Sequence, residues 1–222
     1  MGAYDGLNAY FNGNLCDYAI QYGYDESNII ILKGDYNALQ NNHLHVYNNL
    51  CSCQHHSDKR TPLQYGQDLV ASWIFEDYFL NEMQDYSFTI ELSGADRNRM
   101  ILPNQRTSTS SDYIITSPQG TQIKMELVND YTGFWAKNHT LHLRDNKYLQ
   151  LQRNQCLLLA IALTSYTRKY ALFDFRNDIP AKYIPQHRPY GFKPAYELQI
   201  PATMMHDFSI DNIKEHISQI LY

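Results

Sequence analysis

Residues 111–135 read SDYIITSPQGTQIKMELVNDYTGFW, and this stretch decides how the fold and the chemistry of the chain are interpreted. A β-rich segment follows Asp112, and a second one runs over 121–130. Between them, 117–120 has the serine, proline and glycine composition of a tight turn. The stretch therefore predicts a β-hairpin with an aspartate at the start of its first strand and Glu126 within its second.

The hairpin carries two carboxylates that we expect to act together. Side chains alternate along a strand, so Lys124, Glu126 and Val128 share one face of the second strand. Asp112 enters the paired strand from the end away from the turn, and we expect it to lie beside Glu126. We call Asp112 and Glu126 the acidic pair. Neighbouring carboxylates repel unless a cation or a proton lies between them, and Mg²⁺ is the usual cation.

The sequence on either side of the hairpin predicts further helices and strands. Upstream, Thr61 and Pro62 open a helix whose apolar residues recur at three-to-four spacing. From Pro62 onward the expected order is helix, strand, strand, strand, helix and strand, which indicates an α/β (α+β) domain with a central mixed β-sheet flanked by helices. The other expected elements are strands at 28–33, 87–93, 170–175 and 196–200, helices at 145–167 and from Ser209, and a polar loop over 40–60.

Length and composition favour a folded protein without a membrane partner. The chain has 222 residues, of which 44% are hydrophobic, and this is enough for a substantial core. It contains no apolar run of about 18 residues. It also begins without the basic and apolar segments of a secretion signal, so we expect a cytoplasmic protein.

The four cysteines raise the question of a structural metal. Cys51 and Cys53 precede His55 and His56, a combination that contains zinc-ligating residue types. Structural zinc sites usually draw their ligands from two separated pairs, and no second pair accompanies this one. Free thiols in a cytosolic loop are the preferred interpretation.

Charge is distributed unevenly along the chain. The net charge is −5, but residues 1–95 carry −9 and residues 96–222 carry +4. The basic excess lies between Arg97 and Arg153, and it therefore surrounds the acidic pair. A solvated basic face would explain this pattern. A basic rim around an acidic centre is also the pattern that a metal-dependent nuclease would show.

The order of elements and the positions of the two acids resemble those of the PD-(D/E)xK nuclease superfamily, and within it the type II restriction endonucleases. The resemblance covers roughly residues 65–175. It implies a restriction-endonuclease-like sheet in which Asp112 is the motif aspartate, with Ser111 where proline often stands. Glu126 corresponds to the second acid, and Glu76 to a glutamate that the first helix of the family often carries.

The chain departs from the family pattern at position 128. The pattern has a lysine two residues after the second acid, and this chain has Val128. One explanation is that the lysine comes from elsewhere, with Lys124, Lys137 and Lys147 as candidates. The other is that the site has decayed or carries a substitution, so that the protein binds DNA without cutting it.

The resemblance implies a Mg²⁺-dependent, sequence-specific DNA endonuclease, with Mn²⁺ as a substitute metal. The acidic pair would hold the metal, Lys124 or Lys147 would act on the water or the phosphate, and Glu76 would assist the metal. Double-stranded DNA and a homodimer are the implied partners. Two alternatives are a catalytically impaired DNA-binding homologue and a non-enzymatic protein-interaction domain built on the 19 tyrosines. The expected DNA contacts are Arg97, Arg99, Arg106, Lys137 and Arg144.

The expected organisation is a nuclease-like core domain at 61–222, preceded by an N-terminal extension at 1–60. The extension is acidic and rich in tyrosine and asparagine. Two roles are considered for the extension: a dimer contact, and loops that recognise DNA bases.

Overall fold

The structure, a computed structural model, describes residues 2–53, 60–84, 87–93, 98–103, 111–164 and 166–222. The chain divides into two compact units. This division differs from the predicted boundary after residue 60, because the helix that starts at Pro62 belongs through Asn81 with the helices before it. The N-terminal unit comprises Met1–Asn81 and Ala95–Ser108, and the C-terminal unit comprises Glu82–Gly94 and Thr109–Tyr222.

Helices make up the N-terminal unit within the described residues, and aromatic side chains join several of them. The ring of Phe11 lies 4.5 Å from that of Tyr18 and 5.2 Å from that of Tyr78. The ring of Tyr10 lies 5.9 Å from that of Phe75. These tyrosines are half-buried between the helices. The helices are α1 (Ala3–Tyr10), α2 (Leu15–Gln21), α3 (Glu26–Lys33), α4 (Tyr36–Asn42), α5 (Leu44–Ser52) and α6 (Pro62–Glu82).

Two predictions for the N-terminal unit are wrong. Residues 28–33 lie in helix α3, although their isoleucines favour a strand. Gly34 ends this helix in the left-handed conformation, with a φ of 74°. The predicted polar loop over 40–60 contains the end of α4 and the whole of α5, because the fully buried Leu50 anchors α5 in the core.

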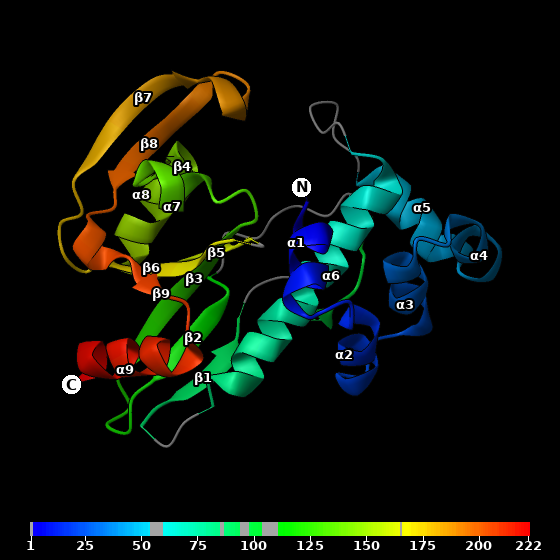
Figure 1. Ribbon diagram of the computed structural model, residues 1–222, viewed down its shortest axis with the longest axis horizontal. Coiled ribbons are helices and arrows are strands. Elements are labelled where there is room, and N and C mark those ends of the chain that lie inside the picture. The colour runs from blue at the N-terminus through cyan, green and yellow to red at the C-terminus, as the bar shows by residue number, and fades with distance from the viewer. Residues whose placement is uncertain (1, 54–59, 85–86, 94–97, 104–110, 165) are drawn as a thin grey trace. The chain divides into compact units, whose positions relative to one another are not determined.

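A six-stranded sheet forms the centre of the C-terminal unit, in the order β1-β2-β3-β5-β6-β9 (Figure 1). The first three strands are antiparallel neighbours, and β5 lies parallel to β3. The mixed sheet flanked by helices is therefore confirmed, as are the hairpin and the strands predicted at 87–93 and 170–175. The strands are β1 (Thr89–Leu92), β2 (Tyr113–Thr116), β3 (Gln122–Asp130), β5 (Leu157–Leu163), β6 (Arg168–Asp174) and β9 (His206–Asp207).

The connection from β3 to β5 runs through helix α8 (Asp145–Asn154). The prediction of one helix over 145–167 is wrong in its second half. Gln155 adopts a left-handed conformation with a φ of 52° and ends the helix, and the apolar run that follows is β5, buried along its whole length. A strand covered on both faces is as uniformly apolar as a buried helix, so the residue pattern does not separate the two.

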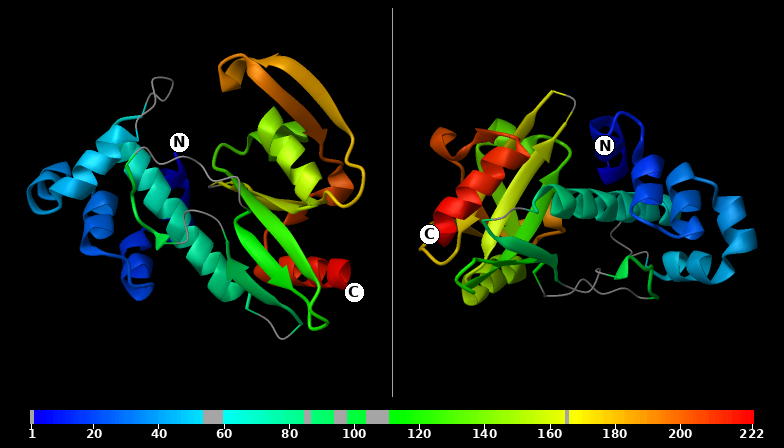
Figure 2. Two further views of the ribbon diagram at one scale, coloured as in Figure 1. Left: turned by 180° about the vertical axis from the view of Figure 1, so that it is seen from behind. Right: turned by 90° about the horizontal axis from the view of Figure 1, so that it is seen from below.

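Helices cover both faces of the six-stranded sheet, as Figure 1 and Figure 2 show. Helix α8 packs on one face, in a core that includes Leu158 of β5. On the other face lies α9 (Ile210–Leu221), where His216 Nδ1 is 3.0 Å from the hydroxyl of Tyr170 on β6. Ser209 is the N-cap of α9, as predicted. Across the described ranges, no helix combines the length and the apolar character needed to cross a membrane.

A smaller three-stranded sheet, in the order β4-β8-β7, packs on the same side as α8. Leu143 and Leu198 from this sheet share the core with Leu158. The strand predicted at 196–200 is confirmed as the second half of β8. The elements not yet named are α7 (Phe134–Asn138), β4 (Thr140–Arg144), β7 (Ala181–His187), β8 (Lys193–Gln199) and the 3-10 turns Arg188–Tyr190 and Ala202–Met204.

Gln155→Gly should stabilise the protein by roughly 0.5–1 kcal/mol, because glycine adopts the left-handed conformation without steric strain. The matched change Asn154→Gly, placed in the regular helix, should destabilise the protein by up to about 1 kcal/mol. Urea unfolding followed by circular dichroism measures both variants. A loss of stability in Gln155→Gly would contradict the assignment of Gln155 as the residue that ends α8.

Candidate active site

The acidic pair lies where two strands separate. The β2–β3 ladder ends with Tyr113 opposite Met125, and Asp112 and Glu126 occupy the next facing positions. Because Tyr113 and Met125 are buried on one face, alternation puts the two carboxylates together on the other. The backbone N–H of Leu127 donates to Asp112 Oδ2 at 2.7 Å. This hydrogen bond fixes the Asp112 carboxylate against β3, as the hairpin geometry predicts.

Glu126 is buried, with only 1% of the residue exposed. Lys147, in the first turn of α8, places its Nζ 2.5 Å from Glu126 Oε2. The crossover that makes β5 parallel to β3 thus brings a cation to the acidic pair. The second oxygen, Glu126 Oε1, is buried and has no hydrogen-bond partner within the described part of the chain.

The surroundings of Glu126 favour its protonated form. Burial raises the pKa of Glu126 most, the charge of Asp112 raises it further, and Lys147 lowers it, which leaves the pKa at about 8. The acidic pair therefore retains a proton at neutral pH when no other cation is bound. A divalent cation would replace that proton, since carboxylate oxygens are the ligands that Mg²⁺ binds. The unpartnered Oε1 supplies an oxygen for such an ion.

The candidate lysines differ in what they contact. Burial and then the charge of Glu126 raise the pKa of the Cys156 thiol, to about 11. Lys124 and Lys147 both oppose this rise. Lys147 alone of the two forms an ion pair with Glu126 within the described residues. Lys124 is exposed on β3. Val128, where the family pattern has its lysine, packs against the core beside α8.

The other predicted basic residues of the C-terminal unit lie on its surface. Lys137 is on α7 and lines a shallow pocket of about 560 Å³, together with the exposed Phe134 and Tyr166. Arg144 precedes α8 as its N-cap residue, and its guanidinium lies 5.5 Å from the ring centre of Tyr190. Both side chains are exposed, and their predicted role as DNA contacts stays a prediction.

The remaining predicted residues belong to the N-terminal unit. Arg99 Nη1 lies 2.7 Å from Glu76 Oε2, and Arg99 Nη2 lies 2.6 Å from Asp77 Oδ1. The Arg99 side chain is 12% exposed. This partly buried ion-pair cluster differs from the predicted roles of Glu76 at a metal and of Arg99 on DNA, because each neutralises the other within the fold. Arg97 and Arg106 lie outside the described residues.

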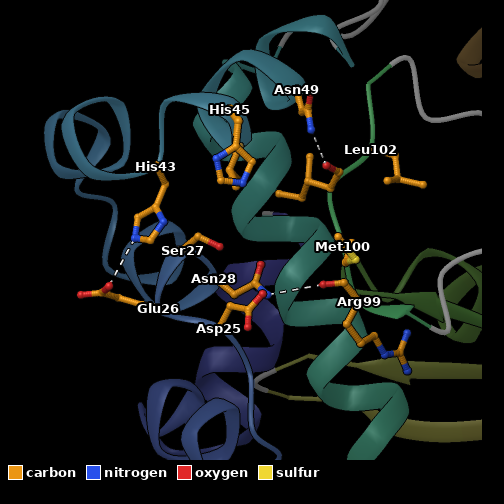
Figure 3. A pocket seen from close by; sticks show the side chains of 12 residues that line it. Asp25, Glu26, Ser27, Asn28, His43, His45, Asn49, Arg99, Met100 and Leu102 are labelled. Carbon is orange, nitrogen blue, oxygen red and sulfur yellow. Dashed lines mark hydrogen bonds and ion pairs between the residues drawn. The ribbon is translucent and has the colours of Figure 1, made fainter.

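The N-terminal unit also contains a pocket of about 330 Å³ between α3, α5 and segment 99–102 (Figure 3). Asn28 Nδ2 donates to the carbonyl of Arg99 at 3.4 Å, and Asn49 Nδ2 donates to that of Ile101 at 3.0 Å. Both amides thus hold the segment against the helices. Because these polar groups serve the fold, we assign the pocket no ligand.

The cysteine and histidine cluster lies only partly within the described residues. Cys51 and Cys53 are free thiols, and His55 and His56 lie outside the described residues. In the part of the chain that the structure describes, no three His, Cys, Asp or Glu side chains gather as metal ligands. The acidic pair offers two carboxylates, which leaves the other positions around a metal to water and a substrate phosphate.

Comparison with known proteins assigns the chain to no group. No protein-family model matches it, and no curated protein is significantly similar to it. The geometry of the acidic pair and Lys147 therefore carries the functional argument.

Sequence reasoning missed two features of this unit. The charges of Glu126 and Lys147 act on the pKa of Cys156, but the prediction of one helix over 145–167 did not indicate that Cys156 precedes β5. The second feature is the basic stretch at 181–193, which lies outside the basic region predicted between Arg97 and Arg153. The absence of any Asp or Glu between 179 and 196 is a signal that could have identified it.

Glu126→Gln should change how stability depends on pH. The pKa of Glu126 is about 8 in the folded protein and about 4.3 in an unfolded chain, so between these values only the folded state keeps the proton. This contribution to stability is complete below the unfolded pKa. It is lost as pH rises towards the folded pKa, at up to about 1.4 kcal/mol per pH unit. Glutamine does not titrate, so the variant should gain stability over the wild type as pH rises through this window.

Urea unfolding at a series of pH values, without divalent metal, measures this effect. The exposed Glu91→Gln is the control for the loss of one carboxylate. A difference between Glu126→Gln and wild type that stays constant with pH would show that Glu126 titrates normally in the folded protein.

Proposed function

We propose that the C-terminal unit is a metal-dependent DNA endonuclease of the PD-(D/E)xK type. The observation that carries this proposal is the convergence of Asp112, Glu126 and Lys147 at one point of the sheet. Two carboxylates and a lysine are the set that the family pattern requires. Lys147 supplies from α8 the cation that the pattern would place at Val128.

The strand order supports the same proposal. The chain runs from helix α6 through the antiparallel strands β1, β2 and β3, and then through α8 to β5, which is parallel to β3. The resemblance rests on the order helix, three strands, helix and strand, and this order recurs here, with α7 and β4 inserted between β3 and α8. Asp112 immediately precedes β2 and Glu126 lies within β3, and this arrangement supports the assignment of the two acids to the family motif.

The metal would be held by Asp112 and Glu126. When bound, a Mg²⁺ ion polarises a phosphate and lowers the pKa of a water molecule. The residues present fit such an ion, because Glu126 Oε1 is buried without a hydrogen-bond partner among the described residues, and because burial and then the adjacent Asp112 raise the pKa of Glu126.

The protein groups have separate tasks in phosphodiester hydrolysis. Asp112 is oriented by its hydrogen bond from the N–H of Leu127, so its position does not depend on the substrate. Lys147, with 32% of its side chain exposed, keeps its ammonium group close to Glu126 and open to solvent. That location allows it to orient an attacking water and to stabilise the negative charge that develops on the phosphate.

The same proposal includes three features that the family resemblance implies. They are duplex DNA as substrate, recognition of a specific sequence, and a homodimer. The exposed Lys137 and Arg144 support a polyanionic substrate. The alternative is a DNA-binding homologue without catalytic activity, and Val128 is the residue that favours it. A cleavage assay separates the two.

Supercoiled plasmid incubated with Mg²⁺ should be nicked or linearised by the wild type. Asp112→Asn and Lys147→Met should lower the rate by roughly 100-fold or more, because each removes a group that acts on developing charge. Lys124→Met is the matched control and should keep the wild-type rate, since Lys124 forms no ion pair with Glu126 in the described part of the chain. Wild-type cleavage by Lys147→Met would contradict the assigned role, and wild-type DNA binding without any cutting would establish the alternative.

Mg²⁺ should raise the Tm of the wild type, and Asp112→Asn should abolish this shift. A ligand that binds only the folded state at 100 times its Kd adds about 2.7 kcal/mol, which corresponds to several degrees for a chain of this size. Differential scanning fluorimetry with increasing Mg²⁺ measures it, with Glu91→Gln as the control. An equal shift in wild type and Asp112→Asn would place the ion elsewhere.

A further inference from the structure

Strands β7 and β8 form a two-stranded ribbon that extends past α8 in Figure 1 and Figure 2. We call residues 181–199 the β7–β8 arm. Its inner strand β8 pairs with β4, and β7 is the outermost strand of the three-stranded sheet. The turn Arg188–Tyr190, followed by Gly191 and Phe192, forms the tip.

The arm is positively charged within an acidic protein. Lys182, Arg188 and Lys193 lie on it, and no Asp or Glu occurs between 179 and 196, although the chain carries a net charge of −5. All three cations are exposed. None of them forms an ion pair with another described residue. Glu197, the one acidic residue of the arm, lies opposite Lys182 in the β7–β8 ladder and 3.1 Å from His142. Arg188 and Lys193, near the tip, have no acidic residue opposite them in this ladder, and exposed cations on a projecting element favour an anionic partner.

Aromatic side chains stand between these cations. Tyr183 is 52% exposed and Phe192 is 64% exposed. Phe192 has a φ of 62°, in the left-handed region that is strained for residues with a side chain. Protection of an edge strand from aggregation would explain Lys182 and Pro185 on β7. It does not explain an exposed, strained phenylalanine at the tip, which is typical of a residue that contacts a ligand.

The tip is held in place before any partner binds. The Tyr190 hydroxyl donates to the carbonyl of His142 at 2.7 Å, and His187 Nε2 lies 2.8 Å from His142 Nδ1. Arg144 stacks on the Tyr190 ring and so adds a further cation at the base of the tip. The arm is thus attached to β4 by contacts that leave its charged side chains in solvent.

We propose that the β7–β8 arm enters the major groove of duplex DNA, with Arg188 and Lys193 on phosphates and Phe192 against the base edges. A two-stranded antiparallel ribbon fits this groove, which is about 12 Å wide. The positive charge favours a polyanion, and DNA is the polyanion of the proposed function. The ribbon shape favours B-form DNA, because the major groove of duplex RNA is too narrow for side chains to read. This inference rests on the proposed function, because it names the element of the fold that binds the proposed DNA substrate.

Binding of a fluorescent DNA duplex to the full chain in EDTA tests the cations without cleavage. A double variant that combines Arg188→Gln and Lys193→Gln should bind the duplex at least tenfold more weakly than the wild type. It should also reduce the slope of log K against log salt by about 1.8, at roughly 0.9 per phosphate contact. The exchange Arg188→Lys with Lys193→Arg keeps both charges and should keep the slope. Lys33→Gln, an exposed lysine of the N-terminal unit, should leave binding unchanged.

Phe192→Trp reports on the tip directly, because both native tryptophans, Trp73 and Trp135, are only 1% exposed. Duplex DNA should quench and shift the emission of the new indole. Tyr222→Trp, at a position that is 71% exposed, is the control and should not respond.

The outcomes separate this inference from the proposed function. If the wild type binds and cuts duplex DNA while the arm variants match it in affinity and salt slope, the arm inference fails and the nuclease proposal stands. If duplex RNA or single strands compete as well as duplex DNA, groove binding by the arm is overturned. If the wild type neither binds nor cuts duplex DNA, both proposals fail.

Discussion

The carboxylate of Glu126 lies in the protein interior beside that of Asp112, and two such groups are stable together only when positive charge or a proton compensates them. The fold meets this constraint in two ways: burial and Asp112 keep a proton on Glu126, and the crossover helix brings Lys147 to it. Both arise from backbone geometry. The ladder between β2 and β3 stops one position before the acids, and β5 takes up the other side of β3. The proposed chemistry depends on this electrostatic balance more than on any single residue.

The hairpin could be predicted because its signals are local. Alternation and turn composition assign 112–130 correctly, and strand parity places Lys124 and Glu126 on the face that the structure shows. The choice among three candidate lysines could not be made from the sequence. Lys147 reaches Glu126 from the first turn of α8, in the connection that carries the chain from β3 to the parallel strand β5, and this contact is a consequence of tertiary packing. Local sequence patterns do not predict such packing.

Residues 28–33 and 156–163 show a second limit. Both are short apolar runs, and their hydrophobicity is compatible with a helix or a strand. Residues 28–33 form a helix where a strand was predicted, and residues 157–163 form a strand where a helix was predicted. In each case the packing of neighbouring elements against the run decides its structure. Arg99 shows the same limit for charge. Its position in a basic region suggested a DNA contact, but Glu76 and Asp77 on α6 enclose it, and only the fold brings them together.

The parallel pairing of β3 with β5 also sets the order in which the site can form during folding. The β2–β3 hairpin joins residues that are close in sequence, so the two acids can meet early. Lys147 reaches them only after the chain has closed the longer connection through α8 and inserted β5 into the sheet. A folding intermediate that contains the hairpin alone would hold two carboxylates without their lysine. The complete charge arrangement is therefore a property of the finished domain, and it would disappear as soon as the β3–β5 crossover opened.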